Sequence, residues 1–266
     1  MTHQLLLTAG YDHSKHSLAV LELLRRKGVS VQKVIIVNTF SKKRLLYYFR
    51  QLDFKEFKKK ALDRVFSSYV SESMISDEVK QVDRFLEKEK IEVQSVSQFC
   101  KKNGIEYIRV NSLSGPEAVS FLEGTDLVIY TGGGILFNSF IKKVKLGVLN
   151  CHAAQLPAIR GTNTSEWSVL LGIPLSTTLH YIVRKIDMGP ILSVQQKDYS
   201  ACHTINQIRG QATVFAIQDL VAATQKIISG DYTPQPQEVA DGKQYYTMHP
   251  ILKHLTEQRW QNHDDT

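Results

Sequence analysis

The chain alternates between short apolar runs and longer stretches in which apolar residues recur every three or four positions. Five apolar-rich runs predict strands, over Gln4–Ala9, Val31–Val37, Glu106–Val110, Leu127–Tyr130 and Gly147–Cys151. Helical spacing predicts helices over Ser17–Lys27, Asp77–Lys90, Ser97–Asn103, Pro116–Leu122 and Thr204–Ser229. Strands alternating with helices predict an α/β fold with a doubly wound, mostly parallel sheet. In such a sheet the functional site lies beyond the carboxyl ends of the strands.

The domain organisation follows from where these elements stop. The last long helical pattern ends near Gly230, and the Pro-containing residues after it break regular structure. We therefore expect one large domain over residues 1–230 and a short C-terminal tail over residues 231–266. The stretch from about 42 to 90 is interpreted as a basic helical insertion within the large domain.

Positive charge is concentrated in one segment. The 266 residues carry a net charge of +7, and Lys42–Arg64 alone holds nine Lys or Arg against three Asp or Glu. The rest of the chain is close to neutral, which argues against a general nucleic-acid-binding surface. Apolar residues recur within the segment at helical spacing, so a solvated amphipathic helix is the favoured interpretation. Contact of this segment with an anionic ligand, RNA or a membrane surface stays open.

Other features of the composition narrow the class of protein. The three cysteines are too few and too widely spaced for a disulfide framework or a metal knuckle. The longest uncharged stretch contains Gly and Pro and does not predict a membrane span, and the N-terminus lacks the features of a secretion signal. We therefore expect no metal, no membrane span and a cytoplasmic location. His13 and His16 are interpreted as surface residues of the first turn.

Candidate chemistry lies at the end of the strand predicted over Gly147–Cys151. Asn150 and His152 are two residues apart, so an extended chain projects both side chains to the same side. An amide donor beside an imidazole suits polarising a carbonyl and moving a proton. A third group is needed to orient the imidazole and to favour its charged form, and Asp187 is the candidate. Taken alone, an Asn-x-His pair at a strand end is more often structural than catalytic.

The order of the motifs is more specific than any one of them. Asn-x-His-x-x-x-Leu-Pro-x-x-Arg-Gly begins at Asn150, Thr-x-His ends at His180, and Asp-x-Gly-Pro-Ile-Leu begins at Asp187. This order resembles the folate-dependent formyltransferase family, over roughly Leu127 to Ile228. The resemblance implies an enzyme with a Rossmann-like formyltransferase core.

The resemblance also implies roles for individual residues. It assigns the catalytic centre to Asn150, His152 and Asp187, with Asn150 stabilising an oxyanion, His152 taking a proton and Asp187 orienting His152. The donor that it implies is N10-formyltetrahydrofolate, bound along Gly133, Gly134, Ile135, Leu136, Ile182, Val183 and Lys185. The amine acceptor is then expected against Arg160, Gly161, Thr162, Asn163, Glu166 and His180.

The acceptor is predicted from the C-terminal tail. Its Gly-Lys-Gln-Tyr-Tyr ending at Tyr246 resembles sugar N-formyltransferases, which implies a nucleotide-linked amino sugar, as in lipopolysaccharide O-antigen biosynthesis. The residues after Gly230 are expected to be too few for the C-terminal barrel of methionyl-tRNA formyltransferases. Methionyl-tRNA and glycinamide ribonucleotide nevertheless remain alternative acceptors. Outside the class, the alternatives are a nucleic-acid-binding protein using residues 42–64 and a dinucleotide-dependent reductase. A homodimer is left open.

Overall fold

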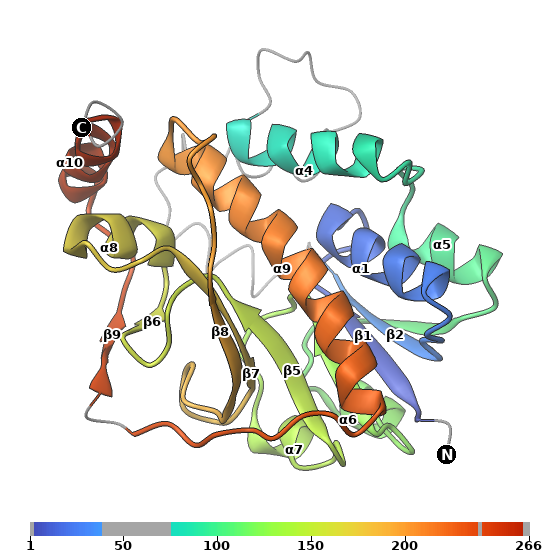
Figure 1. The fold of residues 1–266 in the computed structure, drawn as a ribbon. Coiled ribbons are helices and arrows are strands. Elements are labelled where there is room, and N and C mark those ends of the chain that lie inside the picture. Colours follow the sequence, from blue (N-terminus) through green and yellow to red (C-terminus); the bar gives the residue numbers. More distant parts are fainter. Residues whose placement is uncertain (1–2, 39–75, 239–240, 263–266) are drawn as a thin grey trace.

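A single seven-stranded sheet organises the protein in the computed structural model, which describes residues 3–38, 76–238 and 241–262 (Figure 1). Its strands are β1 (Leu5–Ala9), β2 (Lys33–Val37), β3 (Glu106–Val110), β4 (Leu127–Tyr130), β5 (Gly147–His152), β7 (Ser176–Tyr181) and β8 (Ile191–Gln196). They lie in the order β3-β2-β1-β4-β5-β7-β8; the first five are parallel, whereas β7 and β8 are antiparallel to their neighbours. The predicted α/β fold with a mostly parallel sheet is confirmed.

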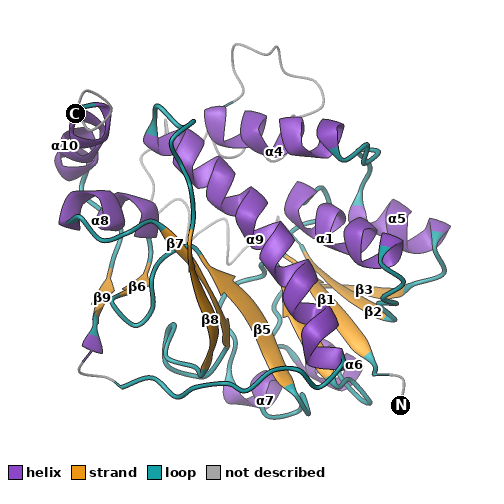
Figure 2. Ribbon diagram, in the orientation of Figure 1, coloured by secondary structure: helices purple, strands orange, loops and turns teal. Residues whose placement is uncertain are grey.

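Helices cover both faces of this sheet (Figure 2). One face carries α1 (Lys15–Arg26), α4 (Asp77–Lys88), α5 (Val96–Lys102) and α9 (Ile205–Ile228). The other face carries α6 (Pro116–Phe121) and α7 (Asn138–Ile141). Side-chain caps fix where two of the helices begin, because Ser14 accepts from the amide of Ser17 and Thr204 accepts from the amide of Gln207. Within the described ranges no helix is both long and apolar enough to cross a membrane.

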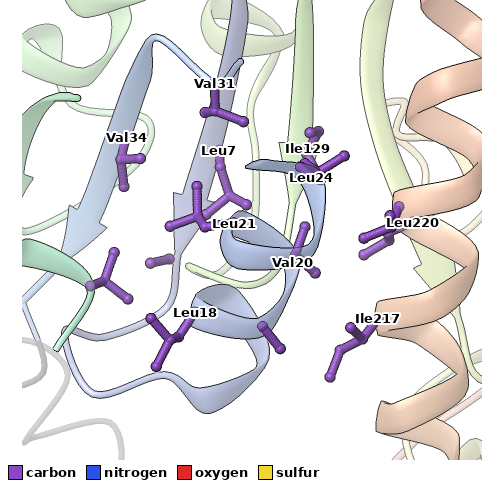
Figure 3. Packing of buried hydrophobic residues seen from close by; sticks show 14 of the residues in the cluster. Leu7, Leu18, Val20, Leu21, Leu24, Val31, Val34, Ile129, Ile217 and Leu220 are labelled. Atoms are coloured by element: carbon purple, nitrogen blue, oxygen red, sulfur yellow. The ribbon is translucent and has the colours of Figure 1, made fainter. Parts of the chain in front are cut away.

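The alternation of side chains along each strand divides the core into two layers. Leu7 of β1 packs with α1 and α9, whereas its neighbour Leu6 belongs to the cluster on the opposite face. Both residues are fully buried, which explains why β1 is apolar at four of its five positions. Figure 3 shows Leu18 and Leu21 of α1 pointing at β1, and Ile217 facing α1 from α9. Burying each such side chain contributes roughly 1.5–3 kcal/mol.

The C-terminal tail is built into the fold through a second, two-stranded sheet. There β6 (Ile159–Gly161) pairs in parallel with β9 (Lys243–Tyr245), and α8 (Thr164–Leu171) packs against α10 (Pro250–Gln261). Trp167 of α8 joins the two parts, because its ring lies 4.9 Å from that of Tyr245 and its indole N–H donates to the carbonyl of Tyr246. The expected division at residue 230 remains a proposal. Of the expected basic insertion, residues 42–75, including the basic segment, lie outside the described residues.

Candidate active site

Antiparallel pairing of β5 with β7 brings two predicted site residues opposite each other. Asn150 of β5 pairs with His180 of β7, and His152 pairs with Thr178. The side-chain amide nitrogen Nδ2 of Asn150 lies 2.9 Å from Nε2 of His180. The imidazole rings of His152 and His180 are nearly perpendicular, with centroids 6.2 Å apart. An amide and two imidazoles therefore share one side of the sheet at the carboxyl end of β5.

The connection between β7 and β8 adds a carboxylate to this group. Asp187 Oδ2 lies 3.6 Å from Nδ1 of His152, and Asp187 Oδ1 lies 3.9 Å from Nε2 of His180. The backbone amide of Gly161 donates to Oδ2 across 2.8 Å. Asp187 has a φ of +51°, a left-handed conformation that costs a non-glycine residue about 1–3 kcal/mol. Contacts from the surrounding structure must therefore stabilise this backbone.

Hydrogen bonding determines the tautomer of His152, a buried residue. Its Nε2 lies 2.9 Å from the carbonyl oxygen of Ile159. Because a carbonyl only accepts, Nε2 carries the hydrogen, and the lone pair of the neutral ring is on Nδ1. That lone pair is on the nitrogen nearest to Asp187. Sequence analysis expects Asp187 to orient the ring; in the structure, the hydrogen bond that holds the neutral ring is the one to the carbonyl of Ile159, on the opposite side.

His180 is held in its neutral form. Burial, reinforced by the nearby His152, lowers the pKa of His180 to about 4. Its Nδ1–H donates to the carbonyl of Tyr181 across 3.0 Å, which leaves the lone pair of Nε2 to accept from the amide of Asn150. This acceptor fixes the orientation of the Asn150 amide. One hydrogen of that amide is used in the bond, and the second is available to another acceptor.

The residues expected on the acceptor side are mostly engaged within the protein. Arg160 is buried in β6 rather than exposed at a turn, and its guanidinium donates to the carbonyl of Gly242 and to the sulfur of Met188. Such internal bonds are required because a buried guanidinium without partners is costly. Glu166 is also buried, and bonds Asn163 and Arg209. Thr162 is exposed, and the amide of Gly161 is bonded to Asp187.

The two segments expected to bind folate border one cluster of the core. Leu136 belongs to this cluster and Ile182 packs against it, so the side chain of Leu136 is used in packing. Ile135 is 72% exposed, and Gly133 and Gly134 form the turn that follows β4. From the second segment, Val183 is half-buried and Lys185 is exposed. Of the residues expected to bind folate, Gly134, Ile135 and Lys185 are exposed, and Gly133, Ile182 and Val183 are half-buried.

Metal and thiol chemistry find little support in the described residues. No cluster of three or more His, Cys, Asp or Glu in residues 3–38, 76–238 and 241–262 could hold a metal ion. Burial raises the pKa of Cys100 to about 12 and that of Cys151 further still. Both thiols are therefore poor nucleophiles near neutral pH.

Comparison with known proteins identifies the family. Residues 67–224, more than half of the chain, match the profile of the family described as formyl transferase. The chain belongs to the formyl transferase family. Among curated family members, the methionyl-tRNA formyltransferase of Enterococcus faecalis is 27% identical over 164 residues, which cover 60% of this chain and 52% of that protein. The chain thus spans about half the length of this curated relative, and of others that it matches.

Solved structures of other family members share the fold. WlaRD, a sugar 3N-formyltransferase crystallised with dTDP and 5-N-formyl-THF, has a TM-score of 0.61 at 13% identity, over 98% of this chain and 80% of that chain. The N-formyltransferase of Helicobacter canadensis, in complex with folinic acid and dTDP-3-aminofucose, has a TM-score of 0.59 at 14% identity, over 97% and 80%. At these identities the likeness establishes the fold of this family member.

Several residues of the site carry no signal in the sequence. Ile159 contributes only its carbonyl group, which every residue possesses. Gln237 bonds the loop of Asp187 from 50 positions further along the chain. Only the position of Ile159 within the Leu-Pro-x-x-Arg-Gly motif, close to His152, could have indicated it. Gly161, which was expected on the acceptor side, instead bonds Asp187 through its backbone amide.

Proposed function

We propose that this chain transfers a formyl group from N10-formyltetrahydrofolate to the primary amine of a nucleotide-linked amino sugar. One observation carries the proposal, namely that four polar side chains converge at the end of β5. The carboxylate of Asp187 lies 3.6 Å from His152 and 3.9 Å from His180. The Asn150 amide lies within hydrogen-bond distance of His180. A hydrogen-bond donor, a proton acceptor and a carboxylate are the groups that acyl transfer to an amine requires. Membership of the formyl transferase family supports the same reaction class.

When bound, the donor supplies a formyl carbon that an amine can attack, and negative charge then develops on the formyl oxygen. Asn150 donates its second amide hydrogen to that oxygen, while His180 keeps the amide in place through the first. Because His180 is neutral, its Nε2 accepts from Asn150 without competing for the oxygen. We therefore assign Asn150 to oxyanion stabilisation and His180 to the orientation of Asn150.

Proton transfer is assigned to His152. Its Nδ1 carries the lone pair of the neutral ring and takes the proton that the attacking amine releases. The proton then lies between Nδ1 and Asp187, whose carboxylate stabilises the imidazolium from 3.6 Å. His152 can pass the same proton to the departing nitrogen. General acid–base groups of this kind typically contribute about 10²–10⁴-fold to the rate.

The proposed donor fits the surface beside this group. A pterin ring is flat and carries many hydrogen-bonding atoms, so it needs apolar contact on its faces and backbone groups at its edge. Ile135 and Phe137 expose 72% and 58% of their surface and offer such apolar contact. Gly134 before them is exposed, with its amide and its carbonyl bonded to the hydroxyl of Tyr130. We propose that the donor lies along Gly133–Leu136 and the loop Ile182–Lys185.

Two acceptors are supported by relatives of this chain, and both enter the test. The sugar acceptor is supported by the solved relatives that match nearly the whole chain and were crystallised with dTDP or with dTDP-3-aminofucose. The curated sequence relatives are named methionyl-tRNA formyltransferases, which makes methionyl-tRNA the second candidate.

An acceptor panel tests the proposal. N10-formyltetrahydrofolate is mixed with the protein and with nucleotide-linked amino sugars, glycinamide ribonucleotide or methionyl-tRNA, and tetrahydrofolate release is followed with mass analysis of the acceptor. We expect the amino sugar to gain about 28 Da, which is the mass added when a formyl group replaces one hydrogen of the amine, and we expect no gain on the other acceptors. Asp187→Asn, which keeps the size of the side chain, serves as the matched control and is expected to lower kcat by about 10²–10⁴.

The other outcomes of the acceptor panel would each change a different part of the proposal. Formylation of methionyl-tRNA or glycinamide ribonucleotide alone would replace the acceptor class and keep the reaction. The absence of formylation on every acceptor would contradict the proposed reaction. Unchanged kcat in Asp187→Asn would contradict the role assigned to Asp187.

A further inference from the structure

The segment that follows α9 crosses the loop carrying Asp187. We call residues 235–237 the C-terminal strap. Gln235 of the strap exchanges two backbone hydrogen bonds with Ile191, the first residue of β8, each 2.7 Å long. In Figure 1 this part of the chain runs from the end of α9 past β7 and β8 toward β9. The strap lies beyond residues 67–224, the part of the chain that matches the family profile.

Gln237 is the strap residue that reaches the Asp187 loop with its side chain. Its Nε2 donates to the carbonyl oxygen of Asp187 across 3.1 Å and also to the carbonyl oxygen of Gly189. One amide nitrogen therefore bonds the backbone on both sides of Met188. The other amide atom of Gln237, Oε1, is buried and has no hydrogen-bond partner among the described residues. The side chain thus acts as a donor to this loop.

The Asp187 backbone needs such a partner. Its φ of +51° is unfavourable for a residue with a side chain, so the loop does not adopt this conformation from local preference. Within the loop, the backbone amide of Met188 lies 3.4 Å from the carbonyl oxygen of Lys185, which is long for a hydrogen bond. Bonds from other parts of the chain therefore stabilise the conformation that directs the carboxylate at His152.

A second connection reaches the same loop from the same part of the chain. Arg160 donates to the sulfur of Met188 with one guanidinium nitrogen and to the carbonyl of Gly242 with another. A Cβ at Gly242 would lie 1.7 Å from the carbonyl oxygen of Pro157, so the chain passes here at a distance only glycine permits. The C-terminal segment and the Asp187 loop are therefore bonded both directly, through Gln237, and indirectly, through Arg160.

We propose that Gln237 is a positioning residue for Asp187, and that the C-terminal strap completes the active site by fixing this aspartate between the two imidazoles. The inference rests on the proposed function, because it takes Asp187 to act on His152. Gln237 itself acts through the loop and is 50 positions from Asp187 in the sequence.

The test replaces Gln237 by methionine, which keeps the length of the side chain and removes its donor. Gln235→Met is the matched control, because Gln235 is an exposed glutamine in the same strap that bonds Ile191 only through its backbone. We expect Gln237→Met to lower kcat at least tenfold with KM for the amine acceptor within about twofold, since the loop that is loosened carries Asp187 but none of the residues expected on the acceptor side. Gln235→Met is expected to keep the wild-type kcat. A kcat for Gln237→Met within twofold of wild type would overturn the proposal.

A double-mutant cycle with Asp187→Asn separates positioning from a general structural effect. If Gln237 acts through Asp187, the Gln237→Met change has little further effect once Asp187 is replaced, so the two losses are not additive. Fully additive losses would overturn the proposal.

Hydrogen exchange gives a readout that needs no turnover. In Gln237→Met, backbone amides in the peptide spanning residues 182–190 are expected to exchange at least tenfold faster than in wild type and in Gln235→Met. Unchanged exchange would overturn the strap's role whether or not an acceptor is found. An absence of formyl transfer in the wild-type protein, with faster exchange in the variant, would instead contradict the proposed function and leave the strap's role supported.

Discussion

Acid is expected to destabilise the fold through His16, in the first turn of α1. Its Nε2 is buried without a hydrogen-bond partner, and burial lowers the pKa of the side chain to about 4. In the unfolded chain the pKa is about 6.5, so between pH 6.5 and 4 the unfolded state binds a proton that the folded state does not. The free energy of unfolding must therefore fall as the pH falls through this range. The loss from this one group is about 2 kcal/mol at pH 5 and about 3 kcal/mol at pH 4, relative to pH 8.

Urea denaturation of wild type and of His16→Leu between pH 4 and pH 8 measures this contribution. His180, whose pKa is also lowered by burial, and the carboxylates affect both proteins equally, so the difference between the two pH curves isolates His16. We expect the difference to grow as the pH falls, with His16→Leu losing less stability. His13→Leu is the matched control, because this imidazole is exposed and lies three positions earlier in the sequence. Parallel curves for wild type and His16→Leu would refute the reasoning.

Three further predictions concern the core. Asp219→Ala is expected to destabilise the fold by about 3–5 kcal/mol in urea denaturation, because Lys197 then loses its 2.8 Å ion pair while its side chain is only 13% exposed. Asp219→Asn is expected to lose less stability than Asp219→Ala. Leu220→Ala is expected to cost about 2–5 kcal/mol in the same assay, since Leu220 is fully buried between α9 and the sheet, and a loss below 1 kcal/mol would contradict that packing. Cys100 is expected to react with a thiol reagent at pH 8 only after unfolding, because the residue is fully buried and burial raises its pKa to about 12, and rapid labelling of this cysteine in the native protein would contradict that burial.

The parallel half of the sheet could be predicted because its strands are buried on both faces. A strand such as β2 has a continuous apolar run over its last four residues, so its pattern in the sequence is strong. The antiparallel strand β7 has no such pattern, since Thr177 and Thr178 are polar yet fully buried. Their hydroxyls bond Asp219 and the carbonyl of Ala154, which are 42 and 24 positions away. Partners at these separations leave no local signal, and β7 and β8 were therefore not predicted from periodicity.

The interpretation of His16 as a surface residue holds only in part, because the side chain is half-buried and its Nε2 has no contact with solvent. Its position at the start of α1 suggested an exposed turn, but α4 and α9 pack beside α1. His16 lines the hollow between them, next to Glu78 of α4 and Thr213 of α9. Burial here depends on the packing of three helices, two of which lie far along the chain from His16.

The residues of the candidate site also differ in how far the sequence alone could predict them. A period of two was enough to place Asn150 and His152 on one side of β5, whereas Asp187 was proposed as the third group that the imidazole needs, and the resemblance gave it the same role. Some of the contacts that orient these side chains come from groups with no pattern of their own, such as the carbonyl of Ile159 and the side chain of Gln237. His180 and Gly161 were named from the sequence as acceptor-side residues, but the structure shows them bonded to Asn150 and Asp187.

The site is assembled from both sheets, and this explains why its restraints extend beyond the part of the chain that matches the family profile. The large sheet supplies Asn150, His152 and His180 through the pairing of β5 with β7. The carboxylate of Asp187 is bonded instead by Gly161 of β6, and β6 is itself paired with β9 of the C-terminal tail. A Cβ at Gly161 would lie 2.0 Å from the carbonyl oxygen of Tyr245, so the amide that bonds Asp187 sits directly against the tail. The geometry of the aspartate therefore depends on the tail docking against β6 as well as on the loop between β7 and β8.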